Sequence, residues 1–160
     1  MAKRSVLLAV ILAAAASIAA HADSLTYVNE RFGTTLTFPL DVFDEIDPPP
    51  ANGDGRRFRS DDGAELAAYG QFNTLDKNPE SLVEWEAGIV GEDGGKVTYS
   101  ASGKDWAVLS GTIGETIFYQ RHEISSDGSV IYSMDMRYPA LRSAFYDRLV
   151  GEIADSLKGP

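Results

Sequence analysis

The sequence predicts an α+β domain in which helices pack on a mainly antiparallel sheet. Short runs of alternating apolar and polar residues recur along the chain, and Gly, Asp and Asn turn signals separate them, as is typical of hairpins. Two longer stretches, one internal and one C-terminal, carry apolar residues at helical spacing. Because consecutive hairpins place neighbouring strands antiparallel, the helices are expected to cover an antiparallel sheet.

The first residues have the composition of a cleavable export signal. Lys3 and Arg4 precede an almost wholly apolar run at 6–16, and small residues around Ala22 suit cleavage before Asp23. The apolar run is shorter than the about 20 residues that a membrane-spanning helix needs, which favours cleavage over an uncleaved anchor. We therefore expect a signal peptide, with the mature protein periplasmic or secreted.

Composition limits what the mature part, residues 23–160, can do. Removing Lys3 and Arg4 from the 14 basic residues leaves 12 against 24 acidic residues, a formal charge of −12. This charge disfavours nucleic acid and anionic membrane surfaces, so we expect neither nucleic acid nor membrane insertion after cleavage. The absence of cysteine excludes thiol nucleophiles, Cys-ligated zinc and disulfides. We predict one domain, without a cofactor.

Strands and a hairpin are expected in the first half of the mature chain. Residues 25–28 and 35–38 alternate in strand fashion, and Pro39 ends the second run. A short helical turn at 41–45 and a proline-rich loop at 47–50 come next. A hairpin is then expected over residues 56–72, with its turn at 61–63.

Helical periodicity marks two segments. Asn78 and Pro79 are a cap and a first-turn proline for a helix at 80–90. A second helix is expected at about 140–158, after four strands at 96–102, 105–110, 115–124 and 129–138. The predicted apolar stripes are Leu82, Trp85 and Ile89 in the first helix and Leu141, Phe145, Leu149, Ile153 and Leu157 in the second. Of these, we predict burial of Trp85, Phe145, Leu149 and Ile153 where the helices meet the sheet.

The order of elements resembles the fold that the photosystem PsbP proteins share with a nuclear Ran-binding factor. The opening segment from Tyr27 to Gly33, with Phe38 and Pro39, looks like the start of PsbP-like domains. A family of uncharacterised exported bacterial proteins is also similar, at Asn52 to Arg56, Phe58, Trp106, Ser110, Gly111, Phe118 and Tyr119. The PsbP resemblance implies a non-catalytic accessory domain that binds a larger assembly.

His122 is the only histidine of the mature chain and therefore the first candidate for a general base. Ser110, Ser125 or Asp135 would have to approach it across the sheet. A Gly-x-Ser-x-Gly turn is absent, since Val108 stands where its first glycine belongs. We therefore interpret His122 as a strand residue that shares a face with Phe118, and we predict no catalytic residue.

Loop oxygens raise the alternative of a calcium binder. The candidate ligands are Asn52, Asp54, Asp61, Asp62, Asp76, Asn78 and Glu80. The EF-hand spacing is not met, because Arg56 stands where the third ligand belongs. These residue types also form turns without any metal, and we predict no metal site.

An arginine cluster is the candidate binding site. Arg56, Arg57 and Arg59 fall within four residues of an acidic chain, and strand alternation places Arg57 and Arg59 on one face. Their guanidinium groups suit a carboxylate or phosphate, so the predicted partner is an unknown protein or a small anionic ligand. Pairing with Asp61, Asp62 and Glu65 is the alternative.

Three classes of function follow from these observations. An exported accessory or interaction domain ranks first, a small-ligand or calcium binder second, and a hydrolase that uses two carboxylates third. A deep pocket with paired acids would favour the hydrolase, whereas an exposed apolar patch would favour a partner surface.

Overall fold

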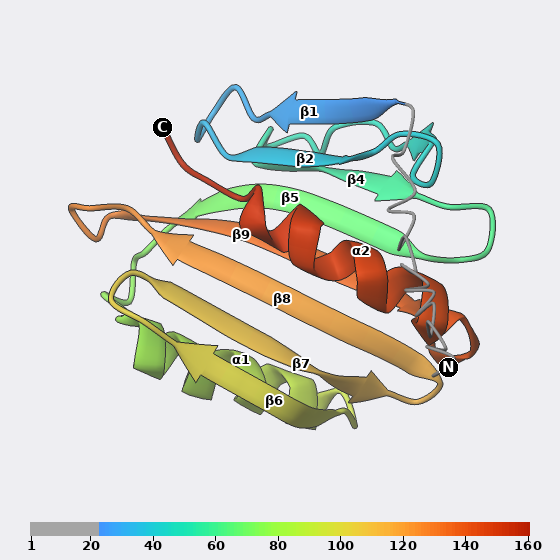
Figure 1. Ribbon diagram of the computed structural model, residues 1–160. Helices are drawn as coiled ribbons and strands as arrows, with labels where there is room; N and C mark the ends of the chain where they lie inside the picture. The colour runs from blue at the N-terminus through green and yellow to red at the C-terminus, as the bar shows by residue number, and fades with distance from the viewer. Residues whose placement is uncertain (1–22) are drawn as a thin grey trace, which may run out of the picture.

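A seven-stranded sheet forms the centre of the fold, in the computed structural model that describes residues 23–160 (Figure 1). The predicted signal peptide lies outside the described residues. The strand order is β3-β4-β5-β9-β8-β7-β6, and every neighbouring pair is antiparallel. Its strands are β3 (Glu45–Ile46), β4 (Gly55–Arg59), β5 (Glu65–Phe72), β6 (Lys96–Ser102), β7 (Trp106–Ile113), β8 (Thr116–Ile124) and β9 (Val130–Pro139). The predicted α+β class and mainly antiparallel sheet are confirmed.

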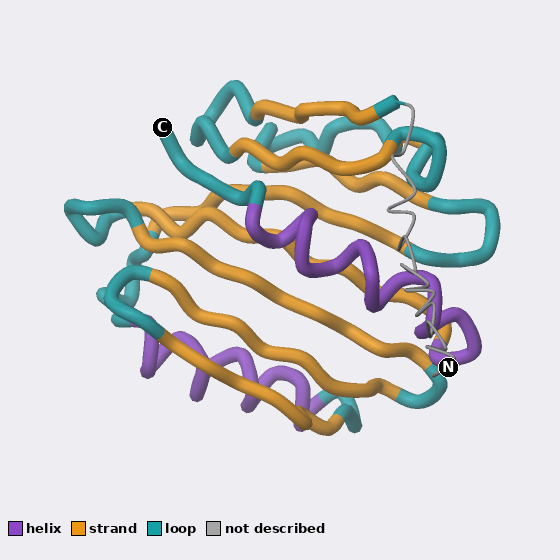
Figure 2. Tube along the Cα trace, in the orientation of Figure 1, coloured by secondary structure: helices purple, strands orange, loops and turns teal. Residues whose placement is uncertain are grey.

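A separate two-stranded ribbon precedes this sheet in the chain. β1 (Ser24–Val28) pairs with β2 (Thr35–Pro39), close to the predicted bounds. The ribbon lies on the β4 and β5 side of the large sheet (Figure 2). The expected turn at 41–45 is present at its start, where the Phe43 N–H bonds the Pro39 carbonyl oxygen at 3.2 Å, but Glu45 instead begins the two-residue strand β3.

The helices cover opposite faces of the large sheet. α1 (Pro79–Glu92) lies on one face against β6 and β7, and α2 (Ser143–Asp155) lies on the other, after a 3-10 turn at Ala140–Arg142. Asn78 caps α1 as predicted, because its side-chain oxygen accepts a 2.9 Å hydrogen bond from the Ser81 N–H.

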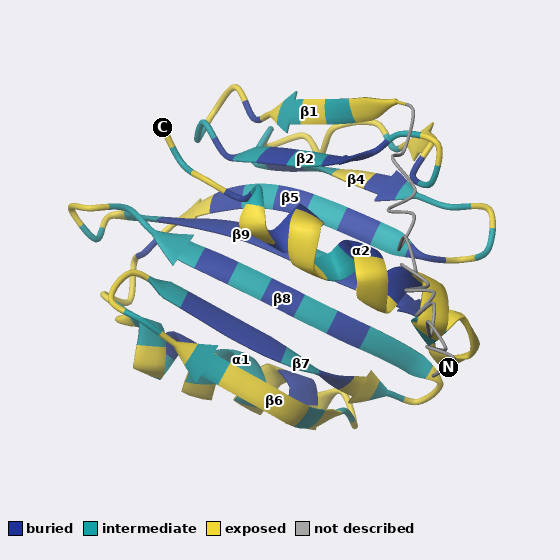
Figure 3. Ribbon diagram, viewed as in Figure 1, coloured by how far each residue is buried: buried dark blue, intermediate teal, exposed yellow. Residues whose placement is uncertain are grey.

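The larger core lies between the sheet, α2 and the ribbon. Leu36 and Phe38 of β2 meet Phe58 of β4, and α2 adds Tyr146 and Ile153. The predicted common face of Leu36 and Phe38 is therefore buried. Alternation of buried and less buried residues along β8 is visible in Figure 3.

Two of the four helix residues that were predicted to be buried are partly exposed. Leu149 and Ile153 are buried as expected, but Trp85 and Phe145 remain 48% and 38% exposed. In α2 the fully buried aromatic residue is Tyr146, because the regular helix begins at Ser143 and its buried stripe follows from there.

The buried side of α1 differs from the predicted apolar stripe for another reason. α1 packs on β6 and β7 at the end of the sheet, with Leu82 and Val90 buried. Trp85 and Ile89 lie on its remaining flank, beyond the strands that it covers.

The candidate interaction face

One side of β4, β5 and β9 has no helix on it, and we call this surface the open face. Cross-strand partners define which residues share it. Ala107 of β7 packs under Leu82 of α1, and its row continues through His122 and Ser133 to Tyr69. These residues therefore lie on the α1 side of the sheet. Because α1 packs on β6 and β7, the surface beyond this row stays open.

A hydrogen-bonded row crosses the sheet under the edge of α1. His122 Nδ1 lies 2.9 Å from Ser133 Oγ, and both residues have no exposed surface. The Ser133 hydroxyl also hydrogen-bonds the Tyr69 hydroxyl. His122 Nε2 has no partner in the described part of the chain. Burial lowers the pKa of His122 to about 4, although Asp135 acts in the opposite direction.

This row does not form a catalytic pair that a substrate can reach. The expected neighbours Ser110, Ser125 and Asp135 do not hydrogen-bond His122; its partner is Ser133, which the sequence did not single out. The imidazole is neutral at pH 7 and fully covered. His122 does share the α1 side with Phe118, as the strand interpretation predicts, since both alternate on β8.

Acidic groups meet next to this row. Asp135 Oδ2 accepts hydrogen bonds from Arg137 Nη2 at 3.0 Å and from Gln120 Nε2 at 3.3 Å. Burial and the charge of Asp135 raise the pKa of Glu86 on α1, while Lys77 opposes the rise. Burial, Asp135 and Glu86 raise the pKa of Tyr69. Asp135 is thus held in place by two side chains, and Tyr69 presents a neutral hydroxyl.

The structure separates the three arginines of the predicted cluster. Arg59 Nη2 bonds Asp47 Oδ2 at 2.8 Å, and Arg56 Nη1 donates to the Asp47 carbonyl oxygen at 3.1 Å. Arg57 has a single long contact, 3.8 Å to Glu65, and its side chain is 52% exposed. The ion pairs thus involve Asp47 and Glu65 (also 3.8 Å from Arg59), whereas Asp62 bonds Arg142. Arg57 is the cation of the cluster that remains most available.

A groove open to solvent begins beside Arg57. Its volume is about 370 Å³, within the range of small-ligand sites. Arg56, Arg57 and Tyr69 line it together with Pro48 and Pro50 of the proline-rich loop. Asp47, Asp54 and Asp135 also line the groove, so its walls carry both signs of charge.

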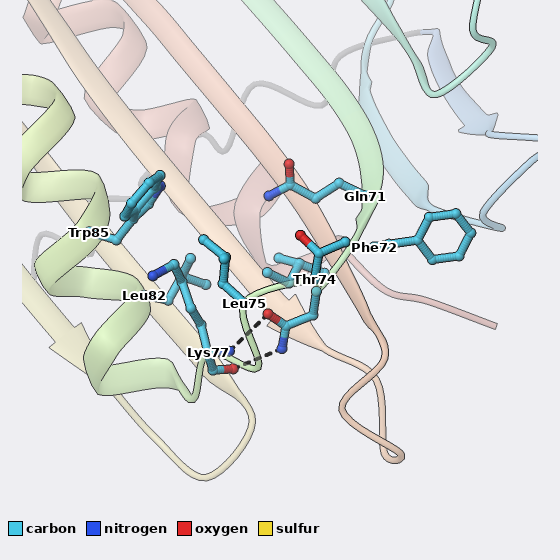
Figure 4. Close-up of a pocket in the computed structure, with 9 residues that line it drawn as sticks. Gln71, Phe72, Thr74, Leu75, Lys77, Leu82 and Trp85 are labelled. Atoms are coloured by element: carbon cyan, nitrogen blue, oxygen red, sulfur yellow. Dashed lines mark hydrogen bonds between the residues drawn. The ribbon is translucent and has the colours of Figure 1, made fainter.

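The flank of α1 forms the opposite, apolar border of the open face. Trp85 and Ile89 are one helical turn apart and both exposed, and Leu75 of the preceding loop is 60% exposed. We call Leu75, Trp85 and Ile89 the apolar patch. Figure 4 shows Leu75 and Trp85 beside a hollow of about 130 Å³, which Leu82 and Ile131 also line. Lys77 Nζ lies 4.2 Å from the Trp85 ring centroid.

Four of the seven candidate calcium ligands are used in local contacts. Asn52 bonds Asp54 at 2.7 Å, Asp62 bonds Arg142 and Tyr146, and Asn78 caps α1. Among residues 23–160, no three acidic or histidine side chains gather closely enough to hold a metal ion. Neither helix in that range has the length and apolar composition that crossing a bilayer requires.

Comparison with known proteins supports the fold. No protein family model matches the sequence, and neither does any curated protein. The solution structure of cyanobacterial PsbP (CyanoP) from Synechocystis sp. PCC 6803 is similar, with a TM-score of 0.65 and 12% sequence identity over 89% of this chain and 95% of that one. The chain therefore has a PsbP-like fold, as its element order and opening segment indicated.

Proposed function

We propose that this chain is an exported, non-catalytic accessory domain that binds a partner protein through the open face. The observation that carries the proposal is the apolar patch. Leu75, Trp85 and Ile89 expose large apolar side chains side by side on an otherwise strongly acidic domain, and such patches characterise interaction surfaces.

The size and composition of the neighbouring hollow favour a protein partner over a small molecule. A volume of about 130 Å³ lies well below the several hundred Å³ of small-ligand pockets, but it is enough to receive one side chain. Tryptophan is among the residues that contribute most to protein interfaces. Lys77, stacked on Trp85, adds a cation at the border of the patch.

The border of the open face opposite the apolar patch is also consistent with binding a partner protein. Arg57 is half exposed across the face from Trp85, and a rim charge of this kind steers and orients a partner more than it adds affinity. Export is supported by the composition of residues 1–22. The PsbP-like fold agrees with an accessory role by analogy of fold only.

The test is capture of a partner from the envelope extract of the source cell with the wild-type protein and with two matched variants. Trp85→Gln changes the patch, and Leu141→Gln changes a 98% exposed leucine beyond the other face of the sheet. We expect Trp85→Gln to lose the captured protein and Leu141→Gln to retain it. Equal capture by both variants would contradict the role of the patch.

A small anionic ligand in the groove beside Arg57 is the second candidate. It rests on the exposed guanidinium of Arg57 and on the groove volume. We expect Arg57→Gln with Arg59→Gln to weaken binding of an anionic ligand or acidic partner while folding is kept, and the wild-type affinity to fall as salt is raised. Equal affinity of the wild type and the double variant at low salt would show that these arginines do not contribute to the binding site.

A further inference from the structure

The two edges of the large sheet differ in how well they are protected. β3, at one edge, has two residues, and Pro48, Pro49 and Pro50 follow it closely and lack backbone donors. β6, at the other edge, has seven residues and no proline, and Lys96 is its only charged residue. It is largely exposed and is the lowest strand in Figure 3. Within residues 23–160, β6 pairs with β7 alone.

The hairpin geometry shows which backbone groups of β6 face outward. The Gly103 N–H donates to the Trp106 carbonyl at 2.9 Å, which makes this pair a hydrogen-bonded one. In an antiparallel ladder such pairs alternate with pairs whose N–H and C=O groups point away from the neighbour. Ala101 therefore bonds β7, whereas Ser100 and Ser102 turn their backbone groups to the free edge.

The regular part of this edge is short and supported. The register shifts between Val97 and Tyr99, so Thr98 has no residue opposite it on β7. Beyond this bulge, Tyr99 to Ser102 pair regularly. Val97 packs into the cluster of Val90 and Leu109, which ties the start of β6 to α1. The edge is thus held in strand geometry before anything binds to it.

Charge distinguishes among the possible occupants. Lys96 and Lys104 are exposed at the two ends of the edge, and neither takes part in an ion pair within the described range. In an antiparallel pair of two β6 edges, Lys96 of one copy would lie near Lys104 of the other, and like charges across a strand pair disfavour such a dimer. We propose that the β6 edge binds an extended segment of a partner protein by strand addition, with acidic residues near the ends of that segment.

A synthetic peptide tests this directly. The probe is a labelled nine-residue peptide that alternates valine and threonine between two terminal glutamates, and fluorescence anisotropy measures its binding to the purified protein. Ser100→Pro removes one outward N–H and leaves the β6–β7 bonds in place, since proline is tolerated where the N–H faces solvent. Ser100→Thr keeps that N–H and is the matched control.

We expect the probe to bind the wild type and Ser100→Thr alike, and Ser100→Pro at least about tenfold more weakly. The same probe N-methylated on its backbone should not bind, which needs no change in the protein. Lys96→Gln with Lys104→Gln should weaken binding and reduce its salt dependence. If Ser100→Pro does not fold, this double variant still tests whether the probe binds at the β6 edge.

Several results would overturn the proposal. These are no saturable binding by the wild type up to about 1 mM peptide, equal affinity of Ser100→Pro, or equal binding of the N-methylated probe. A wild-type dimer in sedimentation that Ser100→Pro dissociates would assign the edge to a second copy instead. Because Trp85→Gln leaves β6 unchanged, its effect on partner capture is independent of this test.

Discussion

His122 Nδ1 lies 2.9 Å from Ser133 Oγ across strands β8 and β9, in a position without exposed surface. The imidazole is neutral there, since burial lowers its pKa to about 4. An unfolded histidine titrates near pH 6.5, so the unfolded chain takes up a proton at higher pH than the folded one. Acidification through this window therefore favours unfolding.

We expect the free energy of unfolding to fall by about 2 kcal/mol between pH 7.5 and pH 5 from this residue alone. The contribution is fully present above about pH 6.5 and is lost progressively down to about pH 4. Urea unfolding at several pH values measures it. His122→Asn should flatten the slope in this window, and an equal slope in both proteins would contradict the assignment.

Tyr146 and Phe145 provide a contrast between neighbouring residues of α2. Tyr146 is fully buried and donates a 2.6 Å hydrogen bond to Asp62, whereas Phe145 lies partly outside the core. Tyr146→Ala should cost about 3–5 kcal/mol of stability. Phe145→Ala should cost about 1 kcal/mol, because less apolar surface is lost from the core. Thermal or urea unfolding of both variants checks the order, and a larger loss at Phe145 would contradict it.

Arg59 and Arg57 should differ in how much they stabilise the protein, as they do in how accessible they are to a ligand. Arg59 bonds Asp47 at 2.8 Å and so joins the proline-rich loop to β4, while Arg57 has only its 3.8 Å contact to Glu65. Arg59→Gln should lower the unfolding free energy by up to about 1 kcal/mol, and Arg57→Gln should leave it nearly unchanged. Denaturant titration of the two single variants at low and raised salt measures these losses. A larger loss of unfolding free energy for Arg57→Gln than for Arg59→Gln would contradict the prediction.

Gly55 permits the close approach of β4 to β5 at the groove. A Cβ atom there would lie 2.5 Å from the Ala68 carbonyl oxygen and 2.5 Å from the Tyr69 Cβ. Because one of these neighbours is backbone, the strands would have to separate. Gly55→Ala should therefore cost about 1–3 kcal/mol. Gly151→Ala in α2 is the control, since a Cβ atom there has open space and no positive φ, and it should not lower the stability. Unfolding measurements that show no loss for Gly55→Ala would contradict this packing.

Processing at the amino terminus stays a prediction from residues 1–22. We expect intact-mass measurement of exported protein to give Asp23 as the first residue. Recovery of the uncleaved chain from membranes would contradict it.

Local signals predicted the secondary structure closely, and tertiary arrangement accounts for what they missed. The strands from β6 to β9 begin or end within a few residues of the expected bounds, because glycine and aspartate turns delimit them. Trp85 has the right periodicity for burial, but periodicity cannot show that α1 covers only the end of the sheet. The helix was therefore predicted correctly, but the exposure of Trp85 on it was not.

The candidate site depended on pairings that no local pattern contains. β5 lies next to β9, so Tyr69 meets Ser133 although 63 intervening residues separate them in the chain. Similarly, Asp47 sits in an irregular loop, and its hydrogen bonds with Arg56 and Arg59 follow from the way that loop folds back. Strand alternation alone did place Arg57 and Arg59 on one face, which the register confirms.

The β1–β2 ribbon is fastened by the last residues of the chain. Thr35 and Lys158 exchange backbone hydrogen bonds of 2.8 and 3.1 Å, and Ser156 Oγ accepts a 2.8 Å bond from the Thr37 N–H. Thr37 and Ser156 are 119 positions apart in the sequence, so the ribbon, although it comes early in the described chain, has these partners only once residues 156–158 are free to fold back on it. Pairing over such a long sequence separation is slow to form, and it makes the ribbon a late part of the folding process.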